Sequence, residues 1–373
     1  MIPTRDQILL LRASLLSGGD ASAAWKTWRK HINFEDIDAG SYRLMPLVYK
    51  NLRRENIEDE LLGRLKGIYR HTWSRNQLLF HDAAQVMAAM QDAGISVLVL
   101  KGATLANSYY SDAGLRPMAD FDFMVPLGEL SRAFEVMKAC GWHYIETVPL
   151  QQLVWASHAE KWKNRNVQHI DLHWSLLADE RQSGSDDEVW PHAAKIEFSG
   201  RCYRAMCETD LLWHVCIHGA VADEIPTIRW VADAWTILQC KRDTIDWERL
   251  VKTMQQRHLT LVIARAFSFL RAEFNAPVPT SVIEELNRSP ASWVERWENR
   301  IKAGPRGILG ALPLHCMNYL RLTKNDRPWH RIAGVPLYFQ RVWGVPACVV
   351  CCFILSKRLR SVLPRLNNKR NNP

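Results

Sequence analysis

Two aspartates separated by one residue lie in a segment with the pattern of a β-strand. Residues 119–125 read ADFDFMV and alternate between polar and apolar side chains. Because side chains at i and i+2 share a strand face, Asp120 and Asp122 lie side by side, while Phe121 and Phe123 face a core. Adjacent carboxylates repel each other, and a divalent cation such as Mg²⁺ relieves that repulsion through oxygen ligation. On the motif alone, a solvated strand face is the favoured interpretation, and further features are needed to favour a metal site.

A third carboxylate lies in a second alternating segment. Residues 169–174 read HIDLHW, so His169, Asp171 and His173 share one face and the three apolar residues share the other. A third carboxylate from a neighbouring strand is what a two-metal phosphoryl-transfer site requires. It can ligate a second ion and accept the proton of the attacking hydroxyl. The alternative interpretation is the polar face of an edge strand.

Features suited to binding phosphate precede the paired aspartates. The run ISVLVL (95–100) predicts a buried strand, and Lys101 and Gly102 form a turn into a predicted helix over 103–110. Glycine allows the backbone to approach a ligand closely, and a helix N-terminus favours phosphate. Arg116, in the loop before the aspartates, has the fork geometry for bidentate phosphate contacts. An ordinary strand-to-helix turn and a surface arginine are the alternatives.

The elements that must position these residues form a small mixed sheet. After the two strands and their helices, the segments LVWASHAEKWK and NVQHIDLHWSLL flank Asn164 and Arg165 and fit a hairpin. Helical periodicity dominates before and after this part of the chain. We therefore predict an α+β fold.

Changes in sequence pattern divide the chain into four predicted regions. An N-terminal helical region spans 1–93, and a small α/β domain spans 94–208. A helical domain follows at 209–303, and a C-terminal extension with an apolar run and a basic tail occupies 304–373. The small mixed-sheet domain is thus inserted between two helical regions.

In order, these motifs resemble the uncharacterised bacterial nucleotidyltransferase family of the DNA polymerase β-type superfamily. The shared pattern is an LKG turn, a Tyr-containing helix, a loop with Arg-Pro, an Asp-x-Asp strand and a later Asp-Leu-His-Trp strand. The helical segments LLWHVCIHGAV, IRWVADAWTIL and IDWERL, and the following NAPVP, are similar as well. The resemblance covers roughly residues 5 to 280.

The resemblance implies a role for each candidate residue. Asp120 and Asp122 match the metal ligands of the superfamily, and Asp171 matches its third catalytic carboxylate, which also binds metal. Lys101 and Gly102 stand at the phosphate-holding turn. Arg116 lies in the long loop typical of the family.

The implied activity is the transfer of a nucleoside monophosphate from an NTP to an unknown hydroxyl-bearing acceptor, with Mg²⁺ or Mn²⁺ as cofactor and pyrophosphate as product. The sequence departs from the superfamily at the turn, which reads Gly102-Ala103 in place of Gly-Ser or Gly-Gly. The interval from Gly102 to Asp120 is also long. These departures keep open a non-catalytic module that binds a nucleotide or a protein.

Two further pairs of polar residues occur in the helical region. His214 and His218 are four residues apart, a spacing found in helical zinc sites, but no third ligand is evident and packing is the favoured interpretation. Arg229 and Asp233, also one turn apart, predict an intrahelical ion pair.

The composition indicates a globular protein with an anionic partner or a basic surface. Net charge is +9, and the sixteen tryptophans are dispersed, without a basic-aromatic motif specific for nucleic acid. The N-terminus is not typical of a signal peptide, and scattered thiols, including the lone Cys348-Val-Val-Cys351, favour the cytoplasm. The apolar run 342–355 and the basic tail leave peripheral membrane contact open, with a packed C-terminal helix as the alternative.

Overall fold

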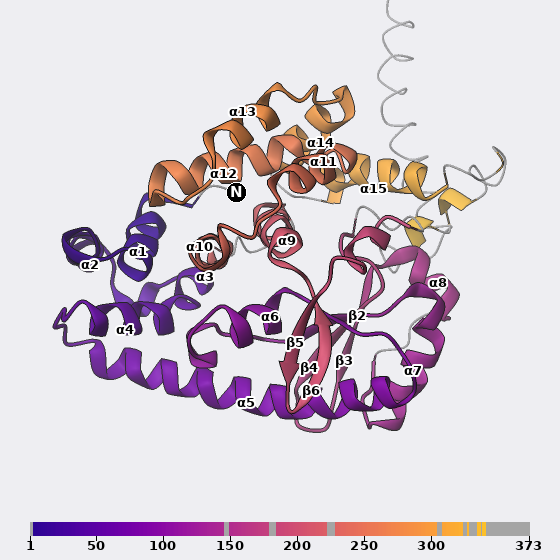
Figure 1. Cartoon of the computed structure of the whole chain (residues 1–373), viewed down its shortest axis with the longest axis horizontal. Coiled ribbons are helices and arrows are strands. Elements are labelled where there is room, and N and C mark those ends of the chain that lie inside the picture. The colour runs from indigo at the N-terminus through magenta and orange to yellow at the C-terminus, as the bar shows by residue number, and fades with distance from the viewer. Residues whose placement is uncertain are drawn as a thin grey trace, which may run out of the picture.

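A computed structural model gives the arrangement of most of the chain. It describes residues 3–144, 149–178, 184–221, 228–303, 308–323, 327, 334–336 and 338–340. The protein is α+β, with one six-stranded mixed sheet and helices on both of its faces (Figure 1). The strands are β1 (Leu98–Val99), β2 (Phe121–Met124), β3 (Ala159–Lys163), β4 (His169–His173), β5 (Ala194–Phe198) and β6 (Arg201–Ala205).

The strand order in the sheet is β3-β4-β2-β1-β6-β5. The pairs β1–β2, β3–β4 and β5–β6 are antiparallel, whereas β2–β4 and β1–β6 are parallel. The predicted hairpin around Asn164 is confirmed as β3 and β4. The β5–β6 hairpin was not predicted from the sequence.

Helices account for most of the remaining described chain. They are α1 (Arg5–Leu15), α2 (Gly18–His31), α3 (Ala39–Tyr42), α4 (Met45–Arg54), α5 (Leu62–Asp92), α6 (Lys101–Ser108), α7 (Leu130–Ala139), α8 (Leu150–Ala156), α9 (Glu208–Val221), α10 (Arg229–Lys241), α11 (Trp247–Gln256), α12 (Thr260–Phe274), α13 (Thr280–Arg288), α14 (Trp293–Ala303) and α15 (Ile308–Leu322). Short 3₁₀ turns lie at Phe34–Asp36, Ala113–Leu115, Leu127–Glu129 and Asp187–Val189.

Local sequence signals set several helix ends. Thr4 and Gln7 form a reciprocal capping box at the start of α1. Asp246, predicted as an N-cap, accepts a hydrogen bond from the backbone N–H of Arg249 at the start of α11. Gly141 follows α7 with φ +79°, a left-handed conformation that glycine adopts without strain.

Two hydrophobic cores lie on opposite faces of the sheet. On one face, Phe121, Phe123, Ile170 and Leu172 pack with α7 and the second half of α5. The other face contributes Leu98, Leu100 and Met124 to a core shared with α1, α4 and α9–α13. The side chains of Phe121 and Phe123 are therefore buried as the alternation predicts, and Asp122 belongs to the second face.

The 31-residue helix α5 connects the two cores. Its first half places Leu65 in the larger core, and its second half places residues Leu79 to Met90 against the sheet. Figure 1 shows α5 running from the N-terminal helices to the sheet. The helix thereby fixes the sheet relative to the helical part of the molecule.

The C-terminal predictions fall outside the described residues. The apolar run 342–355, the Cys348–Cys351 pair and the basic tail all belong to the segment after 340. Among the described helices, none has the length and apolar character needed to cross a membrane.

Candidate active site

Parallel pairing of β2 with β4 brings two of the predicted carboxylates together. Asp122 is the direct partner of Asp171, and Met124 is the partner of His173. Directly paired residues project to the same side of a sheet, so Asp122, Asp171 and His173 share a face. The register thus gathers residues that are 49 to 51 positions apart in the sequence.

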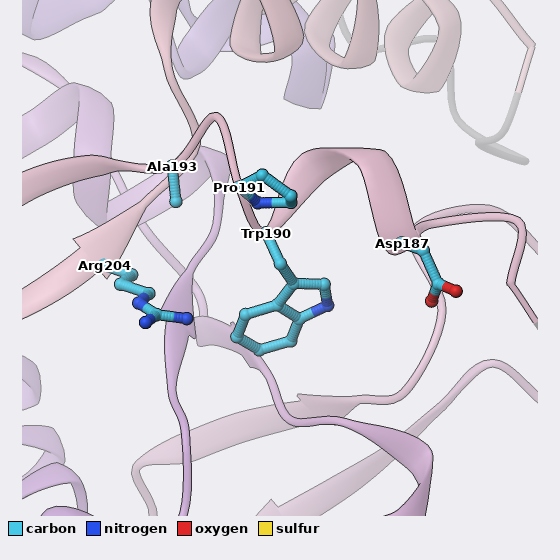
Figure 2. A pocket seen from close by; sticks show the side chains of 5 residues that line it. All are labelled: Asp187, Trp190, Pro191, Ala193 and Arg204. Carbon is cyan, nitrogen blue, oxygen red and sulfur yellow. The ribbon is translucent and has the colours of Figure 1, made fainter.

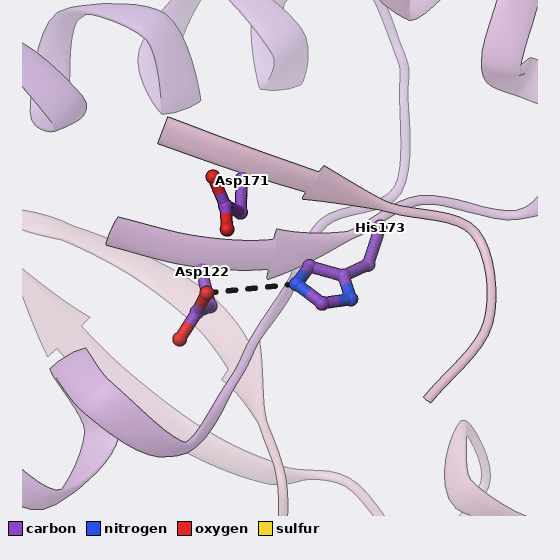
Figure 3. Close-up of side chains that lie close together, drawn as sticks. All are labelled: Asp122, Asp171 and His173. Carbon is purple, nitrogen blue, oxygen red and sulfur yellow. Dashed lines mark ion pairs between the residues drawn. The ribbon is translucent and has the colours of Figure 1, made fainter. Parts of the chain in front are cut away.

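Asp122, Asp171 and His173 form a compact cluster. One potential ligand atom from each lies within 4.8 Å of the others. His173 Nε2 is 3.5 Å from Asp122 Oδ1, and Figure 3 shows the imidazole directed at that carboxylate. Asp122 and His173 are only 6 % and 5 % exposed. Buried Asp171 Oδ1 and both His173 ring nitrogens have no hydrogen-bond partner in the structure.

Asp120 lies at the edge of this cluster. It precedes β2, its side chain is 31 % exposed, and Lys161 Nζ is 3.9 Å from its Oδ2. Its charge nevertheless acts on Asp171, whose pKa it raises. The structure therefore places Asp122 and Asp171 in direct proximity, with Asp120 beside them and partly open to solvent.

The three carboxyl groups have very different proton affinities. Burial, together with the negative charges of Asp120 and Asp122, raises the pKa of Asp171 to about 7. Burial and the charge of Asp122 also raise the pKa of Asp120. Burial has the same tendency at Asp122, but Lys101 and the neighbouring His173 outweigh it and hold that pKa well below its usual value. A cation among these groups would remove the repulsion between them.

The Lys101–Gly102 turn lies directly against the cluster. The backbone N–H of Leu100 donates to the Asp122 carbonyl (3.0 Å), which aligns the end of β1 with the aspartate. A β-carbon added to Gly102 would lie 3.5 Å from both Asp122 Oδ2 and Arg116 Nη1. Gly102 therefore presents bare backbone to the carboxylate, as a turn that holds phosphate beside a metal ligand would.

Arg116 is engaged in a buried ion pair with the helical part of the protein. Its Nε and Nη2 donate to the two carboxylate oxygens of Asp233, both at 2.9 Å, and Nη1 donates to the Gly102 carbonyl at 3.3 Å. The guanidinium thus supports the turn from behind. Its predicted contact with phosphate stays a prediction, and this geometry favours a positioning role.

Asp233 of α10 is a shared acceptor for three neighbours. Besides Arg116, Tyr110 donates its hydroxyl to Asp233 Oδ1 (2.8 Å), and Arg229 Nε lies 3.8 Å from Oδ2. The predicted pair of Arg229 with Asp233 is therefore present, although the two 2.9 Å bonds to Arg116 are closer. Burial and Asp233 raise the pKa of Tyr110 well above its usual value, so the phenol stays protonated.

His214 and His218 are on α9, above the same face of the sheet. The His214 ring is buried, and its Nε2 lies 3.3 Å from the Leu176 carbonyl oxygen. The charge of Lys101, then burial, lowers the pKa of His218, while burial dominates at His214. Within the described part of the chain, the potential metal cluster contains neither of them.

An open recess of about 580 Å³ lies toward the other edge of the sheet. Figure 2 shows Trp190, Arg204 and Asp187 around it, with Pro191 and Ala193. Arg204 pairs with Leu98 of β1, which pairs with Met124 of β2, so Arg204 shares the face of Asp122 two strands away. This recess offers an indole and a guanidinium, which suit a planar or anionic group.

The sequence comparison places these features in a known family. A model of the family described as uncharacterised nucleotidyltransferase matches residues 39–275, which is more than half of the chain and includes every residue of the candidate site. The chain belongs to this family. Nucleotidyltransferases are transferases of phosphorus-containing groups that use an NTP and divalent metal ions, and the resemblance recognised from the motifs is confirmed.

Similarity to solved structures is weaker. The lincomycin-bound lincosamide antibiotic adenylyltransferase LnuA shows 11 % identity and a TM-score of 0.29, covering 42 % of this chain and 94 % of its own. The antibiotic-resistance factor ANT(2'')-Ia shows 11 % identity and a TM-score of 0.33, covering 60 % of this chain and 97 % of its own. No protein with a curated function matches significantly.

Two residues of the site received no role from the sequence. His173 was placed on the same strand face as Asp171, but only the β2–β4 register shows that it reaches Asp122. Asp233 was paired with Arg229 by its helical spacing, and its principal partner lies 117 residues away. Face alternation was the available signal for His173, and none identified Arg116 as the partner of Asp233.

Proposed function

We propose that the protein transfers a nucleoside monophosphate from an NTP to a hydroxyl-bearing acceptor and releases pyrophosphate. The observation that carries this proposal is the direct pairing of Asp122 with Asp171 next to the Lys101–Gly102 turn. Membership of the nucleotidyltransferase family supports it.

The donor set suits a divalent ion such as Mg²⁺ or Mn²⁺. Carboxylates of Asp122 and Asp171 face each other, and the buried Asp171 Oδ1 has no hydrogen-bond donor. Asp120, two residues before Asp122 and partly exposed, supplies a further carboxylate beside them. When bound, the ion neutralises triphosphate charge, which is the main electrostatic requirement of this reaction.

The other residues act on the nucleotide and the acceptor. The bare backbone at Gly102 lets phosphate approach Asp122, and the charge of Lys101 favours that anion. Arg116 holds the turn in place through its bond to the Gly102 carbonyl. Burial, with the charges of Asp120 and Asp122, raises the pKa of Asp171 to about 7, which makes this carboxyl the group suited to receive the proton of the acceptor hydroxyl.

The turn's missing hydroxyl weighs little against catalysis. The Ala103 side chain is fully buried in the core that contains Phe121 and Phe123, on the side away from Asp122. A serine at this position would therefore direct its hydroxyl into that core. The backbone of Gly102, which does face Asp122, is retained.

The test is NMP transfer from labelled NTP in the wild type and in Asp122→Asn and Asp171→Asn. Both substitutions keep the side-chain shape but remove a charge, so we expect transfer to fall at least 100-fold while far-UV circular dichroism is unchanged. Asp120→Asn should also reduce the rate of NMP transfer. Asp243→Asn, at an exposed site, is the matched control. Transfer at the wild-type rate by folded Asp122→Asn would refute the assignment, and tight NTP binding without pyrophosphate release would favour a binding module.

A further inference from the structure

His173 has the properties of a metal ligand rather than of a packing residue. Its side chain is buried between β2 and the chain that enters β3, and its ring is 5.3 Å from that of His158 in an edge-on arrangement. Neither ring nitrogen makes a hydrogen bond, although both are buried. Buried polar atoms in native proteins almost always have a partner. The Nδ1 of His173 has none, and its Nε2 has only the long 3.5 Å approach to Asp122 Oδ1, so the imidazole points to a ligand.

The direction of the ring identifies where that ligand would bind. Nε2 faces Asp122 Oδ1 across 3.5 Å, and the atoms of Asp122, Asp171 and His173 all lie within 4.8 Å of one another (Figure 3). Ligand atoms around one small divalent ion stand about 3 to 4 Å apart, so the cluster needs only small side-chain rotations to close on an ion. Asp171 Oδ1 is also buried and has no hydrogen-bond partner.

The chemistry of this donor set differs from that of a site made of carboxylates alone. Mg²⁺ prefers oxygen ligands and keeps several waters, whereas first-row transition ions accept an imidazole nitrogen readily. Two carboxylates and one neutral imidazole balance the charge of a divalent ion. We propose that Asp122, Asp171 and His173 bind one divalent transition-metal ion, with His173 as a nitrogen ligand that selects Mn²⁺ over Mg²⁺. This proposal deepens the proposed function, on whose metal requirement it rests.

The first measurement uses the wild-type protein and Mn²⁺ alone. Pulsed electron paramagnetic resonance of the bound ion detects a directly coordinated nitrogen through its ¹⁴N coupling. We expect a ¹⁴N coupling in the wild type, and labelling the histidines with ¹⁵N should replace it with the ¹⁵N pattern. Bound Mn²⁺ with only oxygen ligands would overturn the proposal, whatever the variants do.

Substitution then assigns the nitrogen to one residue. In His173→Gln the ¹⁴N coupling should disappear, and the ratio of Mn²⁺ to Mg²⁺ affinity, measured by competition, should fall at least tenfold. His71→Gln, at an exposed position on α5, should retain both properties. A coupling that persists in folded His173→Gln would also overturn the assignment.

The assignment of His173 as a metal ligand and the proposed reaction can fail independently of each other. Nitrogen coordination without NMP transfer would support the metal site and reject the enzyme, whereas transfer with Mn²⁺ held by oxygen atoms alone would do the reverse. Because the spectrum reports coordination without NTP or acceptor, neither result depends on identifying the substrate.

Discussion

Asp171 carries an electrostatic penalty that its neighbours Lys161 and His173 relieve only in part. Burial and the charges of Asp120 and Asp122 all disfavour its ionised form. Lys161, opposite Asp171 on β3, opposes the shift only in part. A buried carboxylate that lowers the stability of the folded protein is typical of a functional site, where a bound cation compensates its charge.

This penalty predicts how stability depends on pH. The folded pKa of about 7 exceeds the unfolded value of about 3.9, so the native state binds the proton more tightly and loses stability as pH rises from about 4 to 7. In EDTA, Asp171→Asn should therefore be more stable than the wild type at pH 8, on the order of 1 to 3 kcal/mol, because one pKa unit equals about 1.4 kcal/mol. At pH 4 the difference should nearly vanish.

Urea unfolding at pH 4 and pH 8 measures this effect. Mn²⁺ at pH 8 should stabilise the wild type and leave Asp171→Asn nearly unchanged. Asp243→Asn, whose side chain is exposed, should show no comparable change with pH. A wild type that gains stability relative to Asp171→Asn between pH 4 and pH 8 in EDTA would contradict the assigned shift.

Substitution of Gly102 can distinguish a structural role of this residue from a functional one. An added methyl group fits without a clash, since its nearest neighbours would be 3.5 Å away. Alanine in the first turn of α6 should therefore leave the free energy of unfolding within about 1 kcal/mol of the wild type or raise it. The methyl group would, however, project beside Asp122, where phosphate must approach.

We expect Gly102→Ala to lower NMP transfer at least tenfold, with the larger effect on the KM for NTP. Gly67→Ala, in α5 with no atom within 4 Å of the added carbon, is the control and should keep full activity. Steady-state kinetics and thermal unfolding of both variants are the measurements. Normal KM in Gly102→Ala would mean that the turn does not contact the nucleotide.

At the level of elements, the pair of Arg116 with Asp233 joins the loop before β2 to helix α10. Both side chains are almost fully buried, and the two bonds are 2.9 Å long. Removing one partner of a buried pair costs about 3 to 5 kcal/mol when the other charge is left uncompensated, whereas removing both costs less. Asp233→Leu should destabilise by that amount, and Arg116→Met by the lower end of it, because Arg229 and Tyr110 still contact Asp233. The double variant should lie well below their sum.

Urea unfolding of the two single variants and the double variant tests this coupling. The pair of Arg12 with Glu273, whose side chains are 40 % and 34 % exposed, is a comparison, because Glu273→Gln should cost less than about 1 kcal/mol. Strictly additive losses at Arg116 and Asp233 would show that the pair does not couple the loop to α10.

The sequence predicted those elements whose periodicity is complete. Alternation found the strands that contain Asp122 and Asp171, and glycine and aspartate signals found the ends of α7 and α11. The β5–β6 hairpin was missed because its strands have only five residues each, and RCYRA at Arg201–Ala205 carries two arginines. Short polar strands give little periodic signal.

The sequence predicted the residues of the candidate site and the convergence of Asp171 on Asp120 and Asp122, but not the strand register that brings them together. Parallel pairing of β2 with β4 depends on packing across the whole sheet, so local pattern could not show that Asp122 meets Asp171 and His173. The same applies to Arg116, whose partner is 117 residues away. Sequence spacing instead predicted the local pair of Arg229 with Asp233. This pair is present, with a longer distance of 3.8 Å between Arg229 Nε and Asp233 Oδ2.

On the scale of the whole molecule, the candidate site lies on the sheet that separates the two cores. Phe121 and Phe123, which flank Asp122 in the sequence, belong to the core on the opposite face of the sheet. Leu100 and Met124 belong to the core on the face of Asp122. Helix α5 contributes to both. A ligand bound at Asp122 and the Lys101–Gly102 turn should therefore stabilise both cores together, as one cooperative unit.

Thermal unfolding tests this consequence. A non-hydrolysable NTP with Mn²⁺, at about 100 times its Kd, should add about 2.7 kcal/mol, which corresponds to a rise in Tm of roughly 3 to 5 °C for a chain of 373 residues. Because we expect NTP to bind through both the ion and the turn, NTP alone or Mn²⁺ alone should give a smaller rise in Tm. In Asp122→Asn, the two together should give almost none. The entire transition should move, since both cores adjoin the site. A rise confined to one of two separate transitions would show instead that the cores unfold independently and that α5 does not couple them.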